Sequence, residues 1–213
     1  MLRLLLLDVS ALNDDRLFQT YFSLLSPVRQ EKVSAFRLRK DKNLSLGAGL
    51  LLDHVLREQG RTEREMSYDF GKSGKPAFRE LPELQFNLSH SGTKVLGAFS
   101  NRPVGCDIEQ LAEANLAVAK RFFAPMEYER LLHTGDRAEL FFRIWTAKES
   151  FLKCTGEGLT RPPESVCLHF GETVSVETAP GFCFHEYGFE DYRAACCCTG
   201  SEPRPEPEYV QII

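Results

Sequence analysis

The sequence lacks any apolar run long enough to span a membrane. Its most apolar stretch opens the chain at residues 1–7, and Asp8 ends it. This stretch also lacks the length and the small-residue cleavage site of a secretory signal. We therefore expect a buried first strand here, a cytoplasmic protein and no membrane partner.

Positive charge is not in excess either. The 26 Lys and Arg residues are balanced by 30 Asp and Glu residues, which leaves a net charge of −4. Nucleic-acid-binding domains carry a basic surface, so this balance predicts no nucleic-acid partner.

The seven cysteines include no Cys-x-x-Cys pair, which argues against a structural zinc site. Three of them are consecutive, at residues 196–198. Neighbouring strand residues face opposite sides, so this triplet cannot supply a regular disulfide framework. We expect buried, reduced cysteines on a strand.

The 213 residues are 43% hydrophobic, enough to bury the core of one large or two small domains. Helical and strand patterns follow in the order helices, strands, helices, strands, which predicts an α+β fold. The helical patterns cover residues 14–38 (interrupted at Pro27), 41–58, 115–123, 125–133 and 136–154. The strand patterns cover residues 66–71, 84–89, 94–100, 165–170, 173–177, 182–187, 192–198 and 209–213. Residues 71–76 are rich in turn formers, and prolines near 200–208 predict a mobile tail segment.

The motif Gly-Cys-Asp-Ile-Glu at residues 105–109 is typical of a strand. Side chains alternate along a strand, so Asp107 and Glu109 point to one face. Cys106 points to the other face, where a small apolar residue suits a core. Taken alone, the two carboxylates are also typical of an exposed strand edge.

The motif Trp-Thr-Ala-Lys-Glu-Ser-Phe-Leu-Lys at residues 145–153 is typical of a helix. Glu149 and Lys153 then lie one turn apart on the same side, while Lys148 faces away and is expected to be solvated or paired elsewhere. A surface Glu–Lys pair of this kind is worth only about 0.3–0.5 kcal/mol. If Glu149 lies close to the two strand carboxylates, however, the three negative charges would repel one another unless a cation were present. The spacing therefore predicts a Mg²⁺ site beside a phosphorylated substrate.

Together the two motifs resemble the signature of the 4′-phosphopantetheinyl transferase superfamily, most closely its longer, surfactin-synthetase-activating type. Two upstream motifs match in the same order, Gly-Lys-Pro at residues 74–76 and Phe-Asn-Leu-Ser-His-Ser-Gly at residues 86–92. The resemblance implies two similar α+β subdomains related by a pseudo-twofold, with the active site in the cleft between them. These would be residues 1–103 and residues 104–213, the latter with the proline-rich tail segment.

The activity implied by the resemblance is transfer of 4′-phosphopantetheine from coenzyme A to a serine of an acyl or peptidyl carrier protein. It would need Mg²⁺ and would release 3′,5′-adenosine bisphosphate. The proton acceptor stays open, because a metal-bound carboxylate such as Glu149 is a weak base unless a bound water relays the proton. His90 would titrate near neutrality, but its motif favours phosphate binding. Glu149 and Lys153 are the expected catalytic residues, and the expected Mg²⁺ ligands are Asp107, Glu109 and Glu149.

The resemblance also assigns residues to coenzyme A. Those expected around the 3′-phosphate and ribose are Arg29, Lys32, Arg39 and Ser45. Those expected against the adenine are Lys75 and Pro76, and those on phosphate oxygens are Ser89, His90 and Lys153. The segment 115–123, with Lys120 and Arg121, is a candidate contact for the acidic carrier protein.

Two other functions stay open from the sequence alone. One is a coenzyme A-binding protein of the same fold that performs no transfer, although a pure binder would not need the metal cluster. The other is a metal-dependent phosphohydrolase, which would cleave coenzyme A without a carrier. A chain of two similar halves builds its cleft internally, so we expect a monomer.

Overall fold

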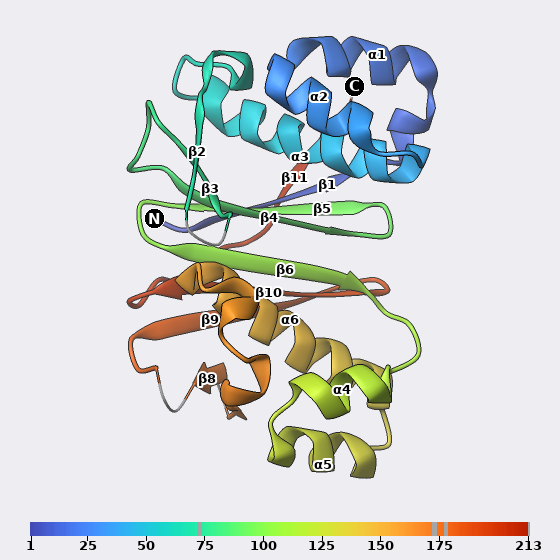
Figure 1. The fold of residues 1–213 in the computed structure, drawn as a ribbon, viewed down its shortest axis with the longest axis vertical. Coiled ribbons are helices and arrows are strands. Elements are labelled where there is room, and N and C mark those ends of the chain that lie inside the picture. Colours follow the sequence, from blue (N-terminus) through green and yellow to red (C-terminus); the bar gives the residue numbers. More distant parts are fainter. Residues whose placement is uncertain (72–73, 172–173, 177–178, 213) are drawn as a thin grey trace.

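A computed structural model describes residues 1–71, 74–171, 174–176 and 179–212. It consists of four layers, in the order helices, sheet, sheet, helices (Figure 1). This arrangement confirms the predicted α+β class. Within the described residues, no helix is both long and apolar enough to cross a membrane.

The first half of the chain supplies the first sheet and the helices that cover it. Its longer elements are β1 (Arg3–Asp8), α1 (Asp15–Leu24), α2 (Pro27–Ala35), α3 (Arg39–Arg57), β4 (Gln85–Ser91) and β5 (Lys94–Ser100). A short hairpin, β2 (Tyr68–Phe70) with β3 (Pro76–Phe78), lies between α3 and β4, and 3₁₀ turns occupy Ser10–Asn13 and Glu63–Glu65. The sheet order is β11-β1-β5-β4, in which β11 (Glu208–Val210) comes from the end of the chain.

The second half repeats this order of elements. Its longer elements are β6 (Val104–Gln110), α4 (Leu116–Phe122), α5 (Pro125–His133), α6 (Arg137–Thr155), β9 (Phe182–Phe189) and β10 (Tyr192–Thr199). A short hairpin, β7 (Leu168–Phe170) with β8 (Val174–Val176), precedes β9, and 3₁₀ turns occupy Gly158–Thr160 and Pro163–Ser165. Its sheet order, β6-β10-β9, repeats β1-β5-β4 strand for strand. The central helices α3 and α6 both have 19 residues.

The two sheets pack face to face, and each is covered on its outer face by helices (Figure 1). The leucine run of β1 shows why. Leu4 and Leu6 point into the cluster between the sheets, while Leu5 and Leu7 point into the cluster under α3. Each leucine buried in this way stabilises the fold by about 1.5–3 kcal/mol. The predicted buried first strand is confirmed, with both faces covered.

Helix ends follow the expected capping chemistry. Ser26 caps α2 by accepting the Arg29 N–H, with Pro27 in the first helical turn. Asp136 caps α6 by accepting the Glu139 N–H at 3.0 Å. At its other end α6 stops at Gly156, whose φ of 71° is the left-handed conformation that glycine tolerates.

Some predicted strands have different limits. The predicted strand at 66–71 is only the three-residue β2, and its partner β3 falls where turns were predicted to end. Pro76 begins β3, a position where its missing N–H is tolerated. The predicted strand at 165–170 begins only at Leu168, because the preceding residues form a 3₁₀ turn. Parts of the predicted segments 71–76, 173–177 and 209–213 lie outside the described residues.

The proline-rich segment near residues 200–208 contacts the second half, and its mobility stays a prediction. The Tyr187 hydroxyl donates to the Pro205 carbonyl at 2.9 Å, and Arg204 donates to the Glu186 carbonyl at 3.0 Å. The chain then forms β11 (Glu208–Val210), which pairs in parallel with β1. The first sheet is therefore built from both ends of the chain, and the division into subdomains at residue 103 stays a prediction.

Candidate active site at the junction of the two halves

Strands β4 and β6 lie where the two sheets meet, and β4 side chains make the connection. The Asn87 side-chain carbonyl accepts the Cys106 N–H at 2.9 Å, and the Ser91 hydroxyl accepts the Gln110 N–H at 3.1 Å. Alternation along β4 directs Asn87, Ser89 and Ser91 to this junction. The polar motif of the first half is thereby held against the acidic motif of the second.

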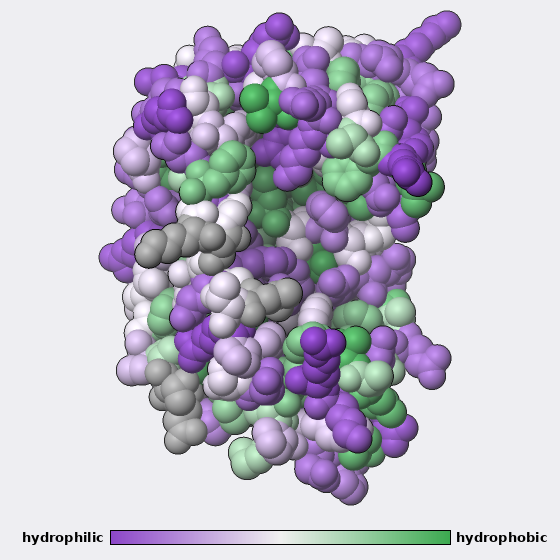
Figure 2. Space-filling model, viewed as in Figure 1, coloured by the Kyte–Doolittle hydropathy of each residue, from purple (hydrophilic) through white to green (hydrophobic). Residues whose placement is uncertain are grey.

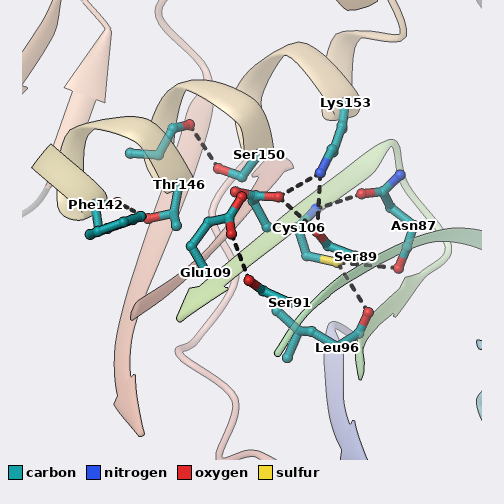
Figure 3. Close-up of polar contacts among 12 residues, drawn as sticks. Asn87, Ser89, Ser91, Leu96, Cys106, Glu109, Phe142, Thr146, Ser150 and Lys153 are labelled. Carbon is teal, nitrogen blue, oxygen red and sulfur yellow. Dashed lines mark hydrogen bonds and ion pairs between the residues drawn. The ribbon is translucent and has the colours of Figure 1, made fainter. Parts of the chain in front are cut away.

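An ion pair between Lys153 and Asp107 lies at the centre of this junction. Figure 3 shows Lys153 on α6 directed toward Ser89 on β4. Lys153 Nζ is 2.6 Å from Asp107 Oδ1 and 3.2 Å from the Ser89 hydroxyl, which itself donates to Asp107 Oδ1 at 2.7 Å. Burial by itself lowers the Lys153 pKa, but Asp107 and, to a smaller extent, Glu149 more than offset it, so the net pKa is raised. Lys153 is thus a charged ammonium group held in a largely enclosed site.

Gly105 allows this contact to form. A Cβ atom at this position would lie 2.1 Å from the Ser150 carbonyl oxygen and 2.4 Å from the Cys154 nitrogen. Only glycine lets the last turns of α6 lie directly on β6. That close approach brings Lys153, on α6, over Asp107, two residues along β6.

Two further carboxylates flank the ion pair. Glu109 accepts a hydrogen bond from the Ser91 hydroxyl at 2.7 Å, and both Glu109 and Glu149 are half-buried. Burial, followed by the charge of Asp107, raises the pKa of Glu109 against the opposing Ser91 hydrogen bond. Burial also raises the pKa of Glu149, with Lys153 opposing and Asp107 adding to the increase. Three carboxyl groups therefore share one poorly hydrated region.

The donor set fits a hard divalent cation. Asp107 Oδ2 is buried and accepts no hydrogen bond, and the Glu149 carboxylate accepts none from the residues that the structure describes. Carboxylate oxygens are the ligands that Mg²⁺ prefers, and a cation would relieve the repulsion by Asp107 that adds to the effect of burial on the two glutamate pKa values. Within the described ranges, no three His, Cys, Asp or Glu side chains converge closely enough to form a preassembled metal site. The Mg²⁺ site stays a prediction.

A pocket of about 200 Å³ opens beside Lys153. Figure 2 shows this side of the molecule, where the surface is hollowed between the two halves. The pocket joins the Gly-Lys-Pro motif of the first half to the end of α6. Its lining residues are Gly74, Lys75, Pro76, Asn87, Leu152, Lys153, Gly156 and Gly158.

Lys75 is in this pocket, but its ammonium group is occupied. Nζ donates to the carbonyls of Val104 at 2.7 Å, Lys153 at 2.8 Å and Cys154 at 3.4 Å. A cation at the carboxyl end of a helix is favourable because it meets the negative end of the helix dipole. Lys75 therefore connects the first half to the end of α6. Only the aliphatic part of its side chain is left to contact adenine.

Basic residues gather on the α2 side of the junction. Arg29 is buried and donates to the Tyr68 hydroxyl at 3.2 Å, with Nε 3.8 Å from Glu63 Oε1. Burial, and then the charge of Arg29, lowers the pKa of Lys32. His90 is exposed, and as the neighbour of Ser89 on β4 it points to the opposite face of that strand.

Arg39 and Ser45, the other two residues expected to bind coenzyme A, make no hydrogen bond to the Asp107 and Lys153 pair among the described residues. The Arg39 guanidinium lies at the start of α1, 2.6 Å from Asp15 Oδ1 and 2.7 Å from the Leu12 carbonyl. These partners hold it away from the Asp107 and Lys153 pair. Ser45 is buried on α3, and its hydroxyl has no hydrogen-bond partner among the described residues.

Of the two expectations for Lys148, pairing elsewhere is confirmed: the side chain is 1% exposed, lies 2.8 Å from Glu127 and donates to the carbonyls of Pro163 and Val166. Sequence reasoning did not identify these partners. No local pattern marks a partner 21 residues earlier on another helix. The roles of Asn87 and Ser91 could have been found, because polar residues alternate regularly along β4.

The predicted carrier-facing helix is α4. Lys120 and Arg121 on it are exposed, whereas Phe123 is buried in the core. The Phe122 ring packs edge-on against Trp145, with ring centroids 6.0 Å apart. The basic side chains are therefore available at the surface, while the aromatic ones anchor the helix.

Comparison with known proteins shows which family the sequence is similar to. The family model of the 4′-phosphopantetheinyl transferase superfamily matches residues 103–197. The chain is 38% identical over 201 residues to 4′-phosphopantetheinyl transferase ffp of Bacillus subtilis, which covers 90% of this chain and 88% of that protein. It is 35% identical to 4′-phosphopantetheinyl transferase Sfp of Bacillus subtilis strain 168, over 75% of this chain and 73% of that one. A third 4′-phosphopantetheinyl transferase of Bacillus subtilis is 31% identical, over 95% of each chain.

Proposed function

This chain belongs to the 4′-phosphopantetheinyl transferase superfamily, and we propose that it transfers 4′-phosphopantetheine from coenzyme A to a serine hydroxyl of an acyl or peptidyl carrier protein. The reaction is Mg²⁺-dependent and releases 3′,5′-adenosine bisphosphate. The protein works as a cytoplasmic monomer, with no nucleic-acid or membrane partner.

One observation carries the proposal. Lys153, Asp107 and Ser89 come from three separate motifs, yet they meet in one hydrogen-bonded group beside an open pocket. A buried ion pair is costly to desolvate and contributes little to stability by itself. Its location beside the pocket supports a role with an anionic ligand.

The bond to be broken is a phosphoanhydride, so the site must hold a pyrophosphate in line with the attacking hydroxyl and accept one proton. Asp107, Glu109 and Glu149 would hold Mg²⁺, which when bound neutralises the negative charge of the pyrophosphate. Lys153 then shifts part of its interaction from Asp107 to a phosphate oxygen. Its raised pKa supports this role, since the group stays charged at neutral pH.

Glu149 accepts the proton of the serine hydroxyl through an intervening water, because a carboxylate that also holds Mg²⁺ is a weak base. Burial raises its pKa, which opposes that weakening. Its carboxylate accepts no hydrogen bond from the described residues, so it is available to that water. His90 is not assigned this role, because it points to the face of β4 opposite to that of Ser89 and is therefore not directed at the Ser89, Asp107 and Lys153 group.

The remaining assigned residues hold coenzyme A along a path from the pocket to α2. Lys75 and Pro76 line the pocket for the adenine ring. Ser89 contacts a pyrophosphate oxygen, and His90, on the opposite face of β4 and within reach of the charge of Lys32, contacts a phosphate oxygen on the α2 side. Arg29, Lys32 and Ser45 serve the 3′-phosphate and ribose, and an unpartnered Ser45 hydroxyl supports this. Arg39 joins them only if its guanidinium leaves Asp15.

The test is intact-mass spectrometry of an apo carrier protein incubated with this protein, coenzyme A and Mg²⁺. We expect the carrier to gain the mass of one 4′-phosphopantetheine group, in step with release of 3′,5′-adenosine bisphosphate, and a chelator to abolish both. A parallel sample without carrier separates transfer from hydrolysis. Bisphosphate release in that sample would point to a phosphohydrolase, and coenzyme A binding with no release in either sample would point to a binding protein.

A further inference from the structure

Two cysteines face each other across the β9–β10 pair, at the end of the sheet away from Glu109. The strands are antiparallel, and Cys183 on β9 is directly opposite Cys198 on β10. Their sulfur atoms are 3.0 Å apart. Both side chains point to the inner face of the sheet, where Cys198 belongs to the cluster between the sheets and Cys183 packs against it.

The backbone around this pair already suits a disulfide bond. Directly opposed residues of an antiparallel pair have Cα atoms about 4.5–5.5 Å apart. Disulfides span Cα separations of about 4.4–6.8 Å. Cross-linking therefore requires the two sulfurs to approach by a small rotation of their side chains and no backbone displacement.

The two thiols differ in exposure and in chemistry. Cys183 is partly exposed on β9, the edge strand of its sheet, whereas Cys198 is fully buried. The hydrogen bond with Cys198 lowers the pKa of Cys183, burial opposes this, and His185 adds to the lowering. The His185 ring nitrogen Nε2 lies 3.9 Å from the Cys183 sulfur. The same thiol–thiol hydrogen bond, together with burial, raises the pKa of Cys198.

We propose that Cys183 and Cys198 form an oxidisable dithiol that a hydroperoxide converts to an intramolecular disulfide. The Cys183 thiolate attacks one peroxide oxygen and breaks the O–O bond, which gives a sulfenic acid and releases hydroxide, taken up as water. The Cys198 sulfur then attacks the sulfenic sulfur, and its proton leaves with the hydroxyl group as a second water. Two thiols and one hydrogen peroxide become one disulfide and two waters, and the two electrons pass to the peroxide.

The other cysteines do not offer this combination. Cys106 and Cys196 are fully buried, and burial raises their pKa values, so little thiolate is present. Cys154 and Cys197 form a second hydrogen-bonded thiol pair, which lowers the pKa of Cys154, but both are buried in the cluster under α6, away from solvent. We therefore expect oxidation to start at Cys183 and end at Cys198.

A disulfide between Cys183 and Cys198 would cross-link β9 to β10 just before the segment 200–208 leaves the sheet. Beyond Cys198 the chain leaves the second sheet at Gly200, whose N–H donates to the Gly181 carbonyl at 2.7 Å, and continues to β11 in the first sheet. The cross-link would stabilise the strand pair from which this crossing starts. This property does not depend on the proposed transferase activity.

The test uses the full chain, first reduced and freed of reductant, then treated with hydrogen peroxide. Remaining thiols are alkylated under denaturing conditions and counted by intact mass. Before peroxide the protein should take up seven alkyl groups, one for each cysteine. After peroxide it should take up two fewer, and peptide mapping should recover Cys183 linked to Cys198 in the monomer.

Variants make the order of events visible. Cys198→Ser should prevent the disulfide and leave Cys183 as a sulfenic acid that dimedone traps. Cys167→Ser, at a partly exposed cysteine outside the pair, should still form the disulfide and serves as the matched control. Full alkylation of wild type after peroxide, or a disulfide that joins other cysteines or two chains, would overturn the proposal.

Discussion

Lys153 has two neighbours that compete for its charge in the proposed reaction, the Asp107 carboxylate and the substrate phosphate. The sequence predicted its place one turn after Glu149, but an ion pair between those two residues is not formed. A tertiary partner has replaced the local one, because Asp107 is buried and needs a counter-charge more than half-exposed Glu149 does.

Lys153→Met should remove the phosphate contact and leave Asp107 without its cation. We expect transfer to a carrier to fall by at least about 100-fold, the scale seen when one preorganised charge-stabilising donor is lost. Lys94→Met is the matched control: it breaks a surface pair with Asp8, 2.9 Å apart, and should change the rate by no more than about twofold. Initial rates from carrier mass spectra provide the comparison, and similar rates for the two variants would remove Lys153 from the mechanism.

The pH dependence of stability reports on Glu149. Its pKa in the fold is raised above that of the unfolded chain, chiefly by burial. Its favourable contribution is therefore complete below the ordinary glutamate pKa, and it is lost as pH rises through the raised value. Without Mg²⁺, Glu149→Gln should be more stable than wild type at about pH 7, and the difference should shrink at about pH 4.

Urea unfolding midpoints at the two pH values measure this effect. The control Glu129→Gln, at an exposed position on α5, should differ from wild type in its midpoint by the same small amount at both pH values. A Glu149→Gln protein that is less stable than wild type at neutral pH would contradict the assigned burial cost. Added Mg²⁺ should raise the midpoint of wild type and have little effect on Glu149→Gln, because a ligand stabilises only the state that binds it.

Among the elements, the contact of β6 with α6 determines the geometry of the site. Alternation predicted correctly that Asp107 and Glu109 share a face of the strand with Cys106 opposite, and helix periodicity predicted α6 to within one residue at each end. Neither pattern contains the distance between the two elements. That distance depends on Gly105. The sequence shows that this residue has no side chain, but it does not show that the backbone of α6 packs against it.

Gly105→Ala should push α6 away from β6, because the new Cβ would overlap the Ser150 carbonyl. Overpacking of this kind costs about 1–3 kcal/mol, and the displaced Lys153 should reduce transfer as well. Gly135→Ala introduces the same methyl group where no atom lies within 4 Å and should alter neither property. Urea midpoints and transfer rates of the two variants provide the test. If Gly105→Ala and Gly135→Ala gave the same midpoint and the same rate, α6 would accommodate the methyl group at residue 105 without loss of stability or activity.

Long-range partners explain what could not be predicted from the sequence. Lys75 belongs to a recognisable motif, yet its ammonium contacts two carbonyls of α6 that are 78 and 79 residues away. Lys148 follows the helical pattern, yet it is buried by a glutamate of another helix. Short elements such as β3 carry too few residues for a period to be recognised, whereas the long elements around the site were predicted well.

At the scale of the whole molecule, the two halves share a core. The cluster between the sheets takes residues from β1, β5, β6, β9 and β10, so neither sheet can lose its partner without exposing apolar surface. β11 adds a second connection by pairing with β1. The repeated order of elements was not visible in the residues, because it is the topology, rather than the sequence, that repeats.

We expect the two halves to unfold together as a consequence of the shared core. The single tryptophan, Trp145, belongs to α6 and reports on the second half by fluorescence, while far-UV circular dichroism reports on both halves. The two signals should give coincident urea transitions. A fluorescence transition separated from the dichroism transition would show that the halves are independent folding units.

If the Asp107 and Lys153 cluster carries out phosphopantetheine transfer, loss of the Asp107 carboxylate should be visible in a single measurement. It is the intact mass of an apo carrier protein after incubation with coenzyme A, Mg²⁺ and either wild type, Asp107→Asn or the surface control Asp191→Asn. We predict that wild type and Asp191→Asn add one 4′-phosphopantetheine group, and that Asp107→Asn adds none while keeping its Trp145 fluorescence. A carrier modified by Asp107→Asn at the wild-type rate would contradict the account.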